Sequence, residues 1–176
     1  MSRVNNLNLE ALAKTREAVE KGEAPAEKVF AAEGEWLFSD EGLFKGKIEY
    51  PGGVMEIVSD QPPQSGGYGK HPNPVQYCVF SMIACYATTF MTLAATKGVN
   101  IKKFRIKGGS VANMKAIMEI EEGPIVKEVF VDVEVESDAD EEVIKGLLEE
   151  ANKKCPAAYT VQNAVPFKAN LTYRKA

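Results

Sequence analysis

The alternation of apolar and polar residues predicts three helices of different character. Over Leu9–Glu20, apolar residues recur on one helical face, Asn8 can cap the first turn, and Gly22 ends the segment. From about Ala139 to Lys153, acidic residues open a second segment and lysines close it, as the helix dipole favours. The third helix, Pro74–Lys97, differs from both because it has no polar face.

The central helix is apolar enough to raise the question of a membrane. Val75–Thr96 contains no charged residue and is long enough to span a bilayer. Polar side chains are nevertheless scattered around the helix, namely Gln76, Ser81, Thr88, Thr89, Thr92 and Thr96. We therefore expect no membrane partner, but a helix buried on most faces in a globular protein. Either the chain's own sheets or a second subunit would wrap it.

Two sets of strands are expected, one before the central helix and one after it. Short turns between the first strands favour an antiparallel meander, and Gln61–Pro74, with four Pro and three Gly, is an irregular loop. In the second set we expect Lys107–Ser110 to be a hairpin turn. The expected strands are Lys28–Phe38, Phe44–Tyr50, Val54–Ser59, Ile101–Lys107, Ala112–Glu119, Ile125–Glu136 and a final Phe167–Tyr173.

Length and charge fix the broad class of the protein. With 176 residues the chain can bury a sizeable core, and the short linker after the first helix predicts a helical extension over residues 1–24 and a main domain over 25–176. Its 21 basic and 25 acidic residues give a net charge of −4, which does not support binding of nucleic acid. The N-terminus lacks the apolar segment of a signal peptide, so we expect a cytoplasmic protein.

The candidate chemistry rests on sulfur. One His and three widely spaced Cys provide no ligand pair at zinc spacing, so no metal site is expected. Pro156 favours a first helical position, which makes Cys155 an N-cap where unpaired N–H groups stabilise a thiolate. Cys85 lies inside the apolar helix, where a free Cys is commonly a small buried hydrophobe. Cys78 lies about 10 Å from Cys85, too far for a disulfide, and is expected to be a packing residue.

Two stretches around these cysteines resemble the OsmC/Ohr family. Asn73-Pro-Val-Gln-Tyr-Cys-Val-Phe-Ser-Met-Ile-Ala-Cys85 is similar to the start of the family's central helix, which carries Pro, an acidic or amide residue, an apolar run and then Cys. Cys155-Pro156, opening a helix after an acidic helix, stands where the family has its second Cys. The order of the expected elements also agrees with the family, from Lys28 to Lys175.

The resemblance implies both a fold and an activity. Family members are α+β proteins in which antiparallel meanders wrap a long buried central helix, and two chains form an intertwined homodimer. The best-known members are thiol peroxidases that reduce organic hydroperoxides in the oxidative stress response. Carried over to this sequence, Cys85 is the attacking thiolate and Cys155 the resolving thiol. A lipoyl or other dithiol reductant then reopens their disulfide, and no further cofactor is implied.

The sequence departs from the peroxidase members at two positions. In those members an Arg from the early strands supplies the cation that stabilises the thiolate, and a Glu just after Asn-Pro orients that Arg. This chain has Val75 and then Gln76 after Asn-Pro, and its early strands offer only Lys45 and Lys47. The candidate substrate-binding residues are therefore Gln76, Tyr77, Lys45 and Lys47. The alternative is a non-catalytic dimer of the same fold that binds a small molecule or has a structural role, so whether the protein is an enzyme stays open.

Overall fold

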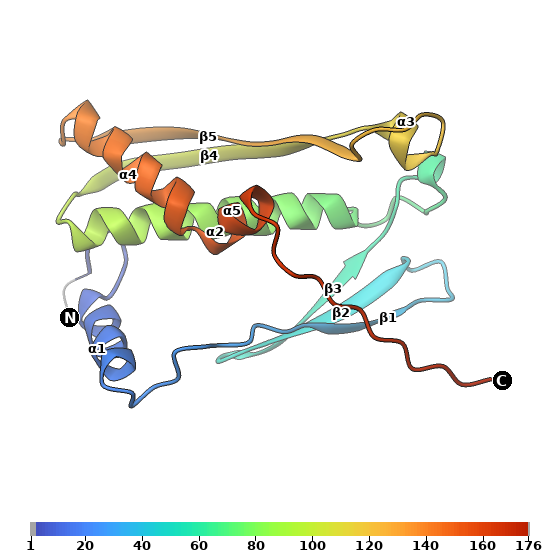
Figure 1. Cartoon of the computed structure of the whole chain (residues 1–176), viewed down its shortest axis with the longest axis horizontal. Coiled ribbons are helices and arrows are strands. Elements are labelled where there is room, and N and C mark those ends of the chain that lie inside the picture. Colours follow the sequence, from blue (N-terminus) through green and yellow to red (C-terminus); the bar gives the residue numbers. More distant parts are fainter. Residues whose placement is uncertain (1–2, 176) are drawn as a thin grey trace.

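The computed structural model describes residues 3–175 as a mixed arrangement of helices and antiparallel strands (Figure 1). A long helix runs through the middle, with a two-stranded hairpin on one side and a three-stranded sheet standing apart on the other. In chain order the elements are α1 (Leu9–Glu20), β1 (Glu33–Trp36), β2 (Phe44–Tyr50), β3 (Gly53–Ser59), the single 3₁₀ turn η1 (Pro63–Ser65), α2 (Pro74–Thr96), β4 (Ile101–Ala112), α3 (Met114–Ile117), β5 (Val126–Ser137), α4 (Glu141–Lys154) and α5 (Pro156–Gln162).

Both sheets are antiparallel, which for the first sheet confirms the prediction from its short turns. Strand β2 lies between β1 and β3, and Trp36 of β1 stands opposite Phe44 of β2. Strands β4 and β5 pair over almost their whole length, starting from Ile101 opposite Ser137. The chain is therefore an α+β protein, with a meander before the long helix and a hairpin after it.

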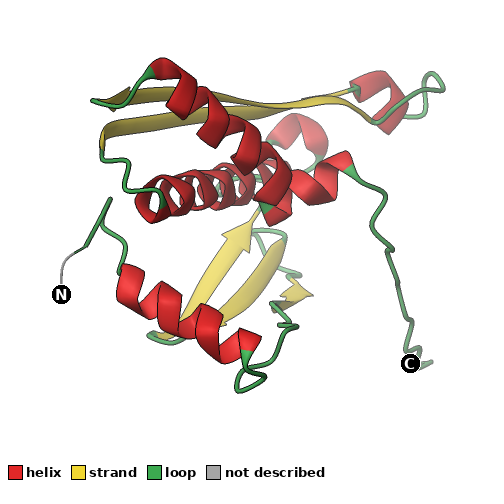
Figure 2. Cartoon of the chain, turned by 60° about the vertical axis from the view of Figure 1, so that its left-hand side comes forward, coloured by secondary structure: helices red, strands yellow, loops and turns green. Residues whose placement is uncertain are grey.

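The core forms where α2 meets α4 and β4. One buried stripe runs along α2 at a spacing of four residues: Met82, Tyr86, Phe90 and Ala94. Leu147 and Ala151 of α4 cover this stripe, and the ring of Phe104 on β4 lies 5.1 Å from the ring of Phe90. Figure 2 shows α4 crossing over α2 below the β4–β5 hairpin. The helix is thus held between the hairpin and the C-terminal helices.

The sequence explains why α2 starts where it does and tolerates apolar surroundings. Asn73 Oδ1 accepts the N–H of Gln76, and Gln76 Oε1 accepts the N–H of Asn73, both at 2.9 Å, in a capping box. Within the helix, threonine hydroxyls donate to carbonyls one turn earlier, as Thr89 does to Cys85. The hydroxyls of Thr88, Thr89 and Thr96 are therefore satisfied inside the helix and do not require water.

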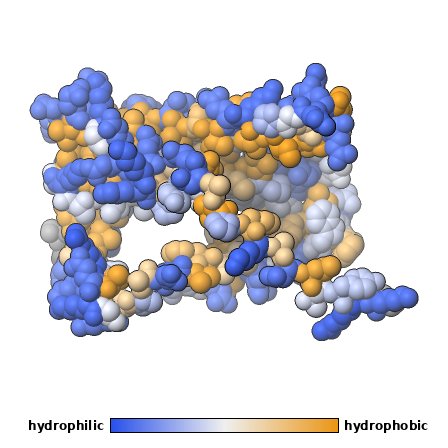
Figure 3. Space-filling model, in the orientation of Figure 1, coloured by the Kyte–Doolittle hydropathy of each residue, from blue (hydrophilic) through white to orange (hydrophobic). Residues whose placement is uncertain are grey.

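A single chain covers only part of α2. Phe80 on this helix is 65% exposed, and the chain has an accessible surface of 13,707 Å². A compact monomer of this mass exposes about 8,400 Å². Figure 3 shows an open window between α2 and the segment that joins α1 to β1. The expected burial on most faces is therefore not met within one chain. By length and composition α2 also qualifies as a membrane span, a test that the core helices of soluble proteins pass as well.

Strand β4 is continuous where the sequence predicted a turn. The expected hairpin turn at Lys107–Ser110 is wrong, because these residues pair in register with β5 and the chain turns at α3 instead. The predicted strand Ala112–Glu119 is also wrong, since Asn113 opens the short helix α3. Gly108 marks a close approach of the long helix, because a Cβ there would lie 2.4 Å from Cγ2 of Ile83. A Cβ on Gly109 would instead meet the ring of Phe130 on β5.

Other predicted elements differ at the edges of the chain. Of Lys28–Phe38 only Glu33–Trp36 pairs with β2, and α4 begins at Glu141 instead of Ala139. The predicted strand Phe167–Tyr173 is wrong for the single chain, in which this segment is extended and exposed. Its apolar residues alternate as in a strand, but no neighbouring strand within the described residues accepts its backbone hydrogen bonds.

The N-terminal segment is attached to the junction between α2 and β4 by one side chain. Asn5 Nδ2 donates to the carbonyl of Val99, and Asn5 Oδ1 accepts the N–H of Ile101, both at 2.9 Å. Helix α1 then has the predicted Asn8 cap and the predicted bounds, but none of its residues is buried. The helix is therefore held through the segment before it, and the domain boundary after residue 24 stays a prediction.

The loop before α2 is organised around one buried carboxylate. Asp60 is 1% exposed, and its oxygens accept the backbone N–H groups of Gln61, Tyr68 and Lys70 at 2.8–3.1 Å. Burial by itself would raise the pKa of Asp60, but these three donors, helped by His71, hold that pKa below its ordinary value. These hydrogen bonds hold the Pro/Gly loop in one conformation directly before α2.

We expect Gly108→Ala to destabilise the fold by about 1–3 kcal/mol, because the new methyl group would push Ile83 and α2 away from β4. Gly146→Ala in α4 is the matched control, since a Cβ there meets no atom within 4 Å. Alanine should stabilise that helix by about 1 kcal/mol. Denaturant titration gives both free energies of unfolding. A Gly108→Ala protein as stable as the wild type would contradict the close packing.

We expect Asp60→Asn to loosen the loop, because the new amide group would place a donor against backbone donors. Exchange of the Tyr68 and Lys70 amide hydrogens should be on the order of tenfold faster at neutral pH, since bonds to a charged acceptor are strong. Because the pKa of Asp60 is lowered by folding, its stabilisation is present above the ordinary Asp pKa. That stabilisation is lost as the pH falls through the lower, folded value.

Hydrogen exchange followed by mass spectrometry, corrected for intrinsic rates, measures this effect. Acidification below about pH 4 should reduce loop protection in the wild type but leave the variant unchanged. Equal protection of the two proteins at neutral pH would show that Asp60 does not hold the loop.

Candidate functional site

Two cysteines from distant parts of the chain meet inside the fold. Cys85 lies next to the buried stripe of α2, and Cys155 lies at the turn between α4 and α5, 70 residues later. Their Sγ atoms are 3.6 Å apart, close enough for a sulfur hydrogen bond, and both thiols are free. The packing of α4 and α5 against α2 therefore brings together the two sulfurs that the sequence singles out.

Local chemistry fixes the position of Cys155. It is the N-cap of α5, Pro156 occupies the first turn, and Cys155 Sγ accepts the N–H of Ala158 at 3.5 Å. The predicted cap is confirmed. Cys155 is 0% exposed, whereas Cys85 is partly exposed. A reagent from solvent therefore meets Cys85 first.

The surroundings of Cys85 in the single chain do not favour its thiolate. Burial raises the pKa of the Cys85 thiol, the N–H of Ala157 lowers it, and the neighbouring sulfur of Cys155 raises it again. The net effect is a pKa above the ordinary value for Cys. Within residues 3–175, no Lys or Arg forms a hydrogen bond with either sulfur. Among the described residues, the single chain therefore places no cation on either sulfur.

Gln76 and Tyr77 have structural partners in the chain. The amide of Gln76 completes the capping box at the start of α2. The hydroxyl of Tyr77 donates to the carbonyl of Val58 at 2.9 Å, which fastens α2 to β3. Both side chains stabilise the junction between the small sheet and the long helix, and their role in substrate binding stays a prediction.

Lys45 and Lys47 lie on a charged face of the small sheet. The register places them opposite Glu35 and Glu33, and both Nζ atoms approach Glu56, at 3.9 and 3.7 Å. They line a shallow cleft of about 280 Å³ on that sheet. The small sheet stands away from α4 and α5 (Figure 1), so the single chain does not bring either lysine to the sulfurs.

The remaining sulfur and ligand candidates form no site in the chain. Cys78 is exposed, so the expectation that it is a packing residue is wrong for the single chain, which leaves this side of α2 uncovered. In the part of the chain that the structure describes, no group of three or more His, Cys, Asp or Glu side chains is placed to hold a metal ion.

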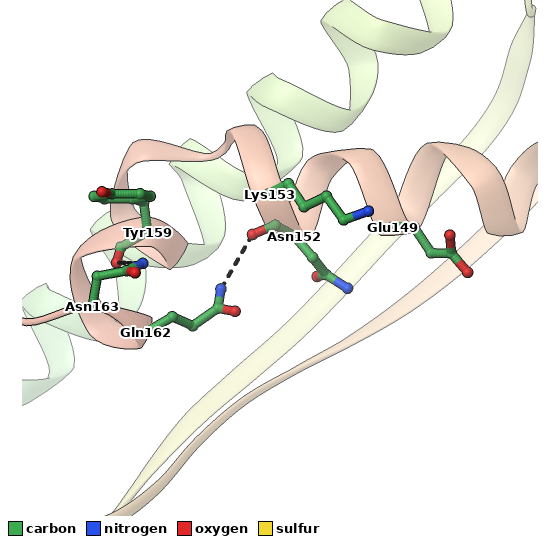
Figure 4. A pocket seen from close by; sticks show the side chains of 6 residues that line it. All are labelled: Glu149, Asn152, Lys153, Tyr159, Gln162 and Asn163. Atoms are coloured by element: carbon green, nitrogen blue, oxygen red, sulfur yellow. Dashed lines mark hydrogen bonds between the residues drawn. The ribbon is translucent and has the colours of Figure 1, made fainter.

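The structure also reveals polar residues around Cys155 that the sequence analysis missed. A shallow cleft of about 400 Å³ lies on the outside of the α4–α5 turn and is not lined by either cysteine (Figure 4). On the inside, the hydroxyl of Tyr86 contacts Asn152. One signal was present in the sequence: a tyrosine at a position expected to be buried needs a partner for its hydroxyl. The cleft is lined by Glu149, Asn152, Lys153, Tyr159, Gln162 and Asn163.

The two sulfurs form a centre suited to thiol–disulfide chemistry. One thiol is reachable and the other is sealed, so oxidation of the first can be followed by attack of the second from inside the fold. Closing a disulfide requires a sulfur–sulfur distance of about 2.05 Å, so the two atoms have to approach by about 1.5 Å. That movement is small enough to occur without unfolding either helix.

Comparisons with known proteins agree with this geometry. A family model described as OsmC-like protein matches residues 67–170, which include both cysteines. No curated protein matches the chain in sequence. The fold is similar to that of an OsmC-like protein from Mycoplasma pneumoniae, with 19% identity and a TM-score of 0.63 over 77% of this chain and 89% of that chain.

Two further solved structures with similar folds are named for a function. An organic hydroperoxide resistance protein OsmC from Legionella pneumophila has 15% identity and a TM-score of 0.55, over 78% of this chain and 92% of that chain. An organic hydroperoxide resistance protein from Elizabethkingia anophelis has 15% identity and a TM-score of 0.58, over 79% of this chain and 91% of that chain. At such identities the structures establish a shared fold. Since the family model covers more than half of the residues, the chain belongs to the OsmC-like protein family.

Proposed function

We propose that this protein is a thiol-dependent peroxidase that reduces organic hydroperoxides, with Cys85 attacking and Cys155 resolving. The observation that carries the proposal is the 3.6 Å separation of the two sulfurs, one partly exposed and one sealed. A non-catalytic member of the fold has no need for two free thiols in contact. The hydroperoxide resistance proteins with similar folds add support from outside the chain.

The proposed reaction proceeds in two steps. The Cys85 thiolate attacks one oxygen of the hydroperoxide, the O–O bond breaks, and the alkoxide leaves as an alcohol after taking a proton. Cys85 is then a sulfenic acid. The thiolate of Cys155 attacks that sulfur, the S–S bond forms, and the S–O bond breaks to release hydroxide, which takes a proton to become water. The peroxide is reduced by two electrons, and the two thiols are oxidised.

A dithiol of the lipoyl type completes the proposed cycle. One of its thiolates attacks the Cys85–Cys155 disulfide, its second thiol closes the mixed disulfide, and both cysteines return to the reduced form. The reaction requires no cofactor resident in the protein. The proposed location is the cytoplasm, where such thiols are kept reduced.

We also propose that the active form is a homodimer. The accessible surface of the chain exceeds that of a compact monomer by about 5,000 Å², which is more than the roughly 1,000–2,500 Å² that each subunit of an obligate dimer buries. On the uncovered side of α2, the exposed residues Ser81, Ala84 and Thr88 are small enough for a second helix to approach closely. The unpaired segment 167–173 can add to a sheet edge of the other chain.

The proposed dimer can also supply the cation that the sulfurs lack among the described residues of the single chain. Lys45 and Lys47 are the basic residues of β1–β3, and among the described residues each forms a long ion pair with Glu56. In the proposed assembly one of these lysines stands in for the arginine of the peroxidase members. Lysine provides a point charge without a bidentate fork, so the thiolate would be stabilised less strongly.

Titration of the reduced protein with one equivalent of cumene hydroperoxide should produce a Cys85–Cys155 disulfide, identified by peptide mass. Cys85→Ser should lower peroxide consumption by about a thousandfold, as expected for loss of a nucleophile. Cys155→Ser should stop at a sulfenic acid on Cys85, which dimedone traps. Cys78→Ser, the same chemical change seven residues before Cys85 on the same helix, is the matched control and should react like the wild type. Thiols that survive the peroxide unchanged would refute the proposed activity.

Sedimentation of the wild type should show a dimer from high to low micromolar concentration. Phe80→Glu places a charge on the uncovered side of α2, where a monomer would tolerate it at a cost of about 0.5 kcal/mol or less. In the dimer the same charge would be buried without a partner, so this variant should dissociate or aggregate. A wild-type chain that sediments as a stable, folded monomer would rule out the proposed assembly.

A further inference from the structure

A single hydroxyl connects the helix of Cys85 to the helix that ends at Cys155. Tyr86 directly follows Cys85 and is 1% exposed. Its hydroxyl lies 2.7 Å from Oδ1 of Asn152 and 3.2 Å from the carbonyl oxygen of Leu148, both on α4. Asn152 precedes Cys155 by three residues, so this hydroxyl fixes the last turn of α4 relative to α2.

The same asparagine connects α4 to α5. Gln162 Nε2, at the end of α5, donates to the backbone carbonyl of Asn152 at 3.1 Å (Figure 4). It also donates to the backbone carbonyl of Ala158 at 3.1 Å. The N–H of Ala158 in turn contacts Cys155 Sγ at 3.5 Å. The turn that carries Cys155 is therefore held from α2 on one side and from α5 on the other.

We propose that Tyr86 and Asn152 are positioning residues that hold Cys155 against Cys85 for disulfide closure. The inference rests on the proposed peroxidase function for the identity of the oxidant. In the step concerned, the Cys155 thiolate attacks the sulfenic sulfur of Cys85, the S–S bond forms, and the S–O bond breaks to release hydroxide. Since Cys155 is fully buried, its approach is limited by how the α4–α5 turn is held.

The aromatic ring of Tyr86 is enough to fill its place in the core, so its hydroxyl is not needed for packing. Phe90, one turn later on the same stripe, fills the core with a ring alone. A phenylalanine at position 86 would cover the same apolar surface but release Asn152. Because a hydrogen bond has a direction and an apolar contact does not, the Tyr86–Asn152 bond can set the orientation of the turn in a way that ring packing cannot.

Rapid mixing of the reduced protein with cumene hydroperoxide separates the two steps. Dimedone trapping gives the rate of sulfenic acid formation at Cys85, and peptide mass gives the rate of disulfide closure. We expect Tyr86→Phe and Asn152→Ala each to slow closure on the order of tenfold, while sulfenic acid forms within about twofold of the wild-type rate. If the two residues act as one unit, the double variant should close no more slowly than the slower single variant.

Tyr159→Phe is the matched control, since it removes a hydroxyl from a half-exposed tyrosine on the outside of the same turn. It should close at the wild-type rate. Circular dichroism and thermal unfolding check that all variants fold. Closure at the wild-type rate in both Tyr86→Phe and Asn152→Ala would overturn the inference, and so would equal slowing of both steps.

A second oxidant separates this inference from the peroxidase proposal. Diamide oxidises two thiols to a disulfide while it is reduced to the hydrazine, so it tests closure without any hydroperoxide. If the protein fails to react with cumene hydroperoxide but diamide closes the wild-type disulfide about tenfold faster than that of Tyr86→Phe, the peroxidase proposal fails and the positioning role stands. If diamide closes both at the same rate, the positioning role fails.

Discussion

The contact between α2 and α4 is the interaction on which the rest of the structure depends. Tyr86 of α2 is buried against Leu147 and Ala151 of α4, and burial of large apolar side chains contributes about 1.5–3 kcal/mol each. Cys85 directly precedes this contact, and Cys155 follows it by one helical turn. The contact that forms the core therefore also sets the distance between the sulfurs. The stability of the core and the geometry of the site are therefore coupled, and a change that loosens the core also changes the distance between the two sulfurs.

The α2–α4 interface is not uniform along its length. Its centre is apolar, where Phe90 of α2 and Leu147 of α4 belong to one buried cluster. Next to the sulfurs it contains the hydroxyl of Tyr86 and the amide of Asn152. A buried hydroxyl destabilises a core unless it is bonded, and once bonded it adds direction to a contact that otherwise has none. The Tyr86–Asn152 hydrogen bond thus lies next to the two sulfur atoms that have to approach to bonding distance.

Local patterns in the sequence predict most elements of this fold, and failures occur where a non-local neighbour decides. The bounds of α1 and β2 agree because caps, turns and periodicity act over a few residues. The glycines within Lys107–Ser110 suit a turn or a close approach, and the neighbours that folding supplies, α2 for Gly108 and Phe130 of β5 for Gly109, select the second. Phe167–Tyr173 has the alternation of a strand but no partner in its own chain. Alternation specifies a face, whereas a strand also requires a neighbour.

The candidate site shows the same division. The two cysteines could be singled out because each has a local signature, a helix interior for Cys85 and an N-cap with Pro156 for Cys155. The link between Tyr86 and Asn152 joins residues 66 positions apart and has no local signature beyond a hydroxyl in an apolar run. Positioning residues of this kind become visible only when the helices are packed.

Under the proposed function, a second chain would account for two features of the single chain: a thiol without a cation and a long helix that is partly uncovered. The thiol of Cys85 has a raised pKa and no hydrogen bond from a Lys or Arg among the described residues, and the helix that carries it is left uncovered on the side of Phe80. A second chain seated on the open side of α2 would exclude water from that side, which by itself raises the thiol pKa further. The same chain must therefore also supply positive charge, since burial without a cation would make the thiol less reactive than it is in the monomer. A dimer that activates the Cys85 thiol therefore has to bring a cation to it as well as cover α2.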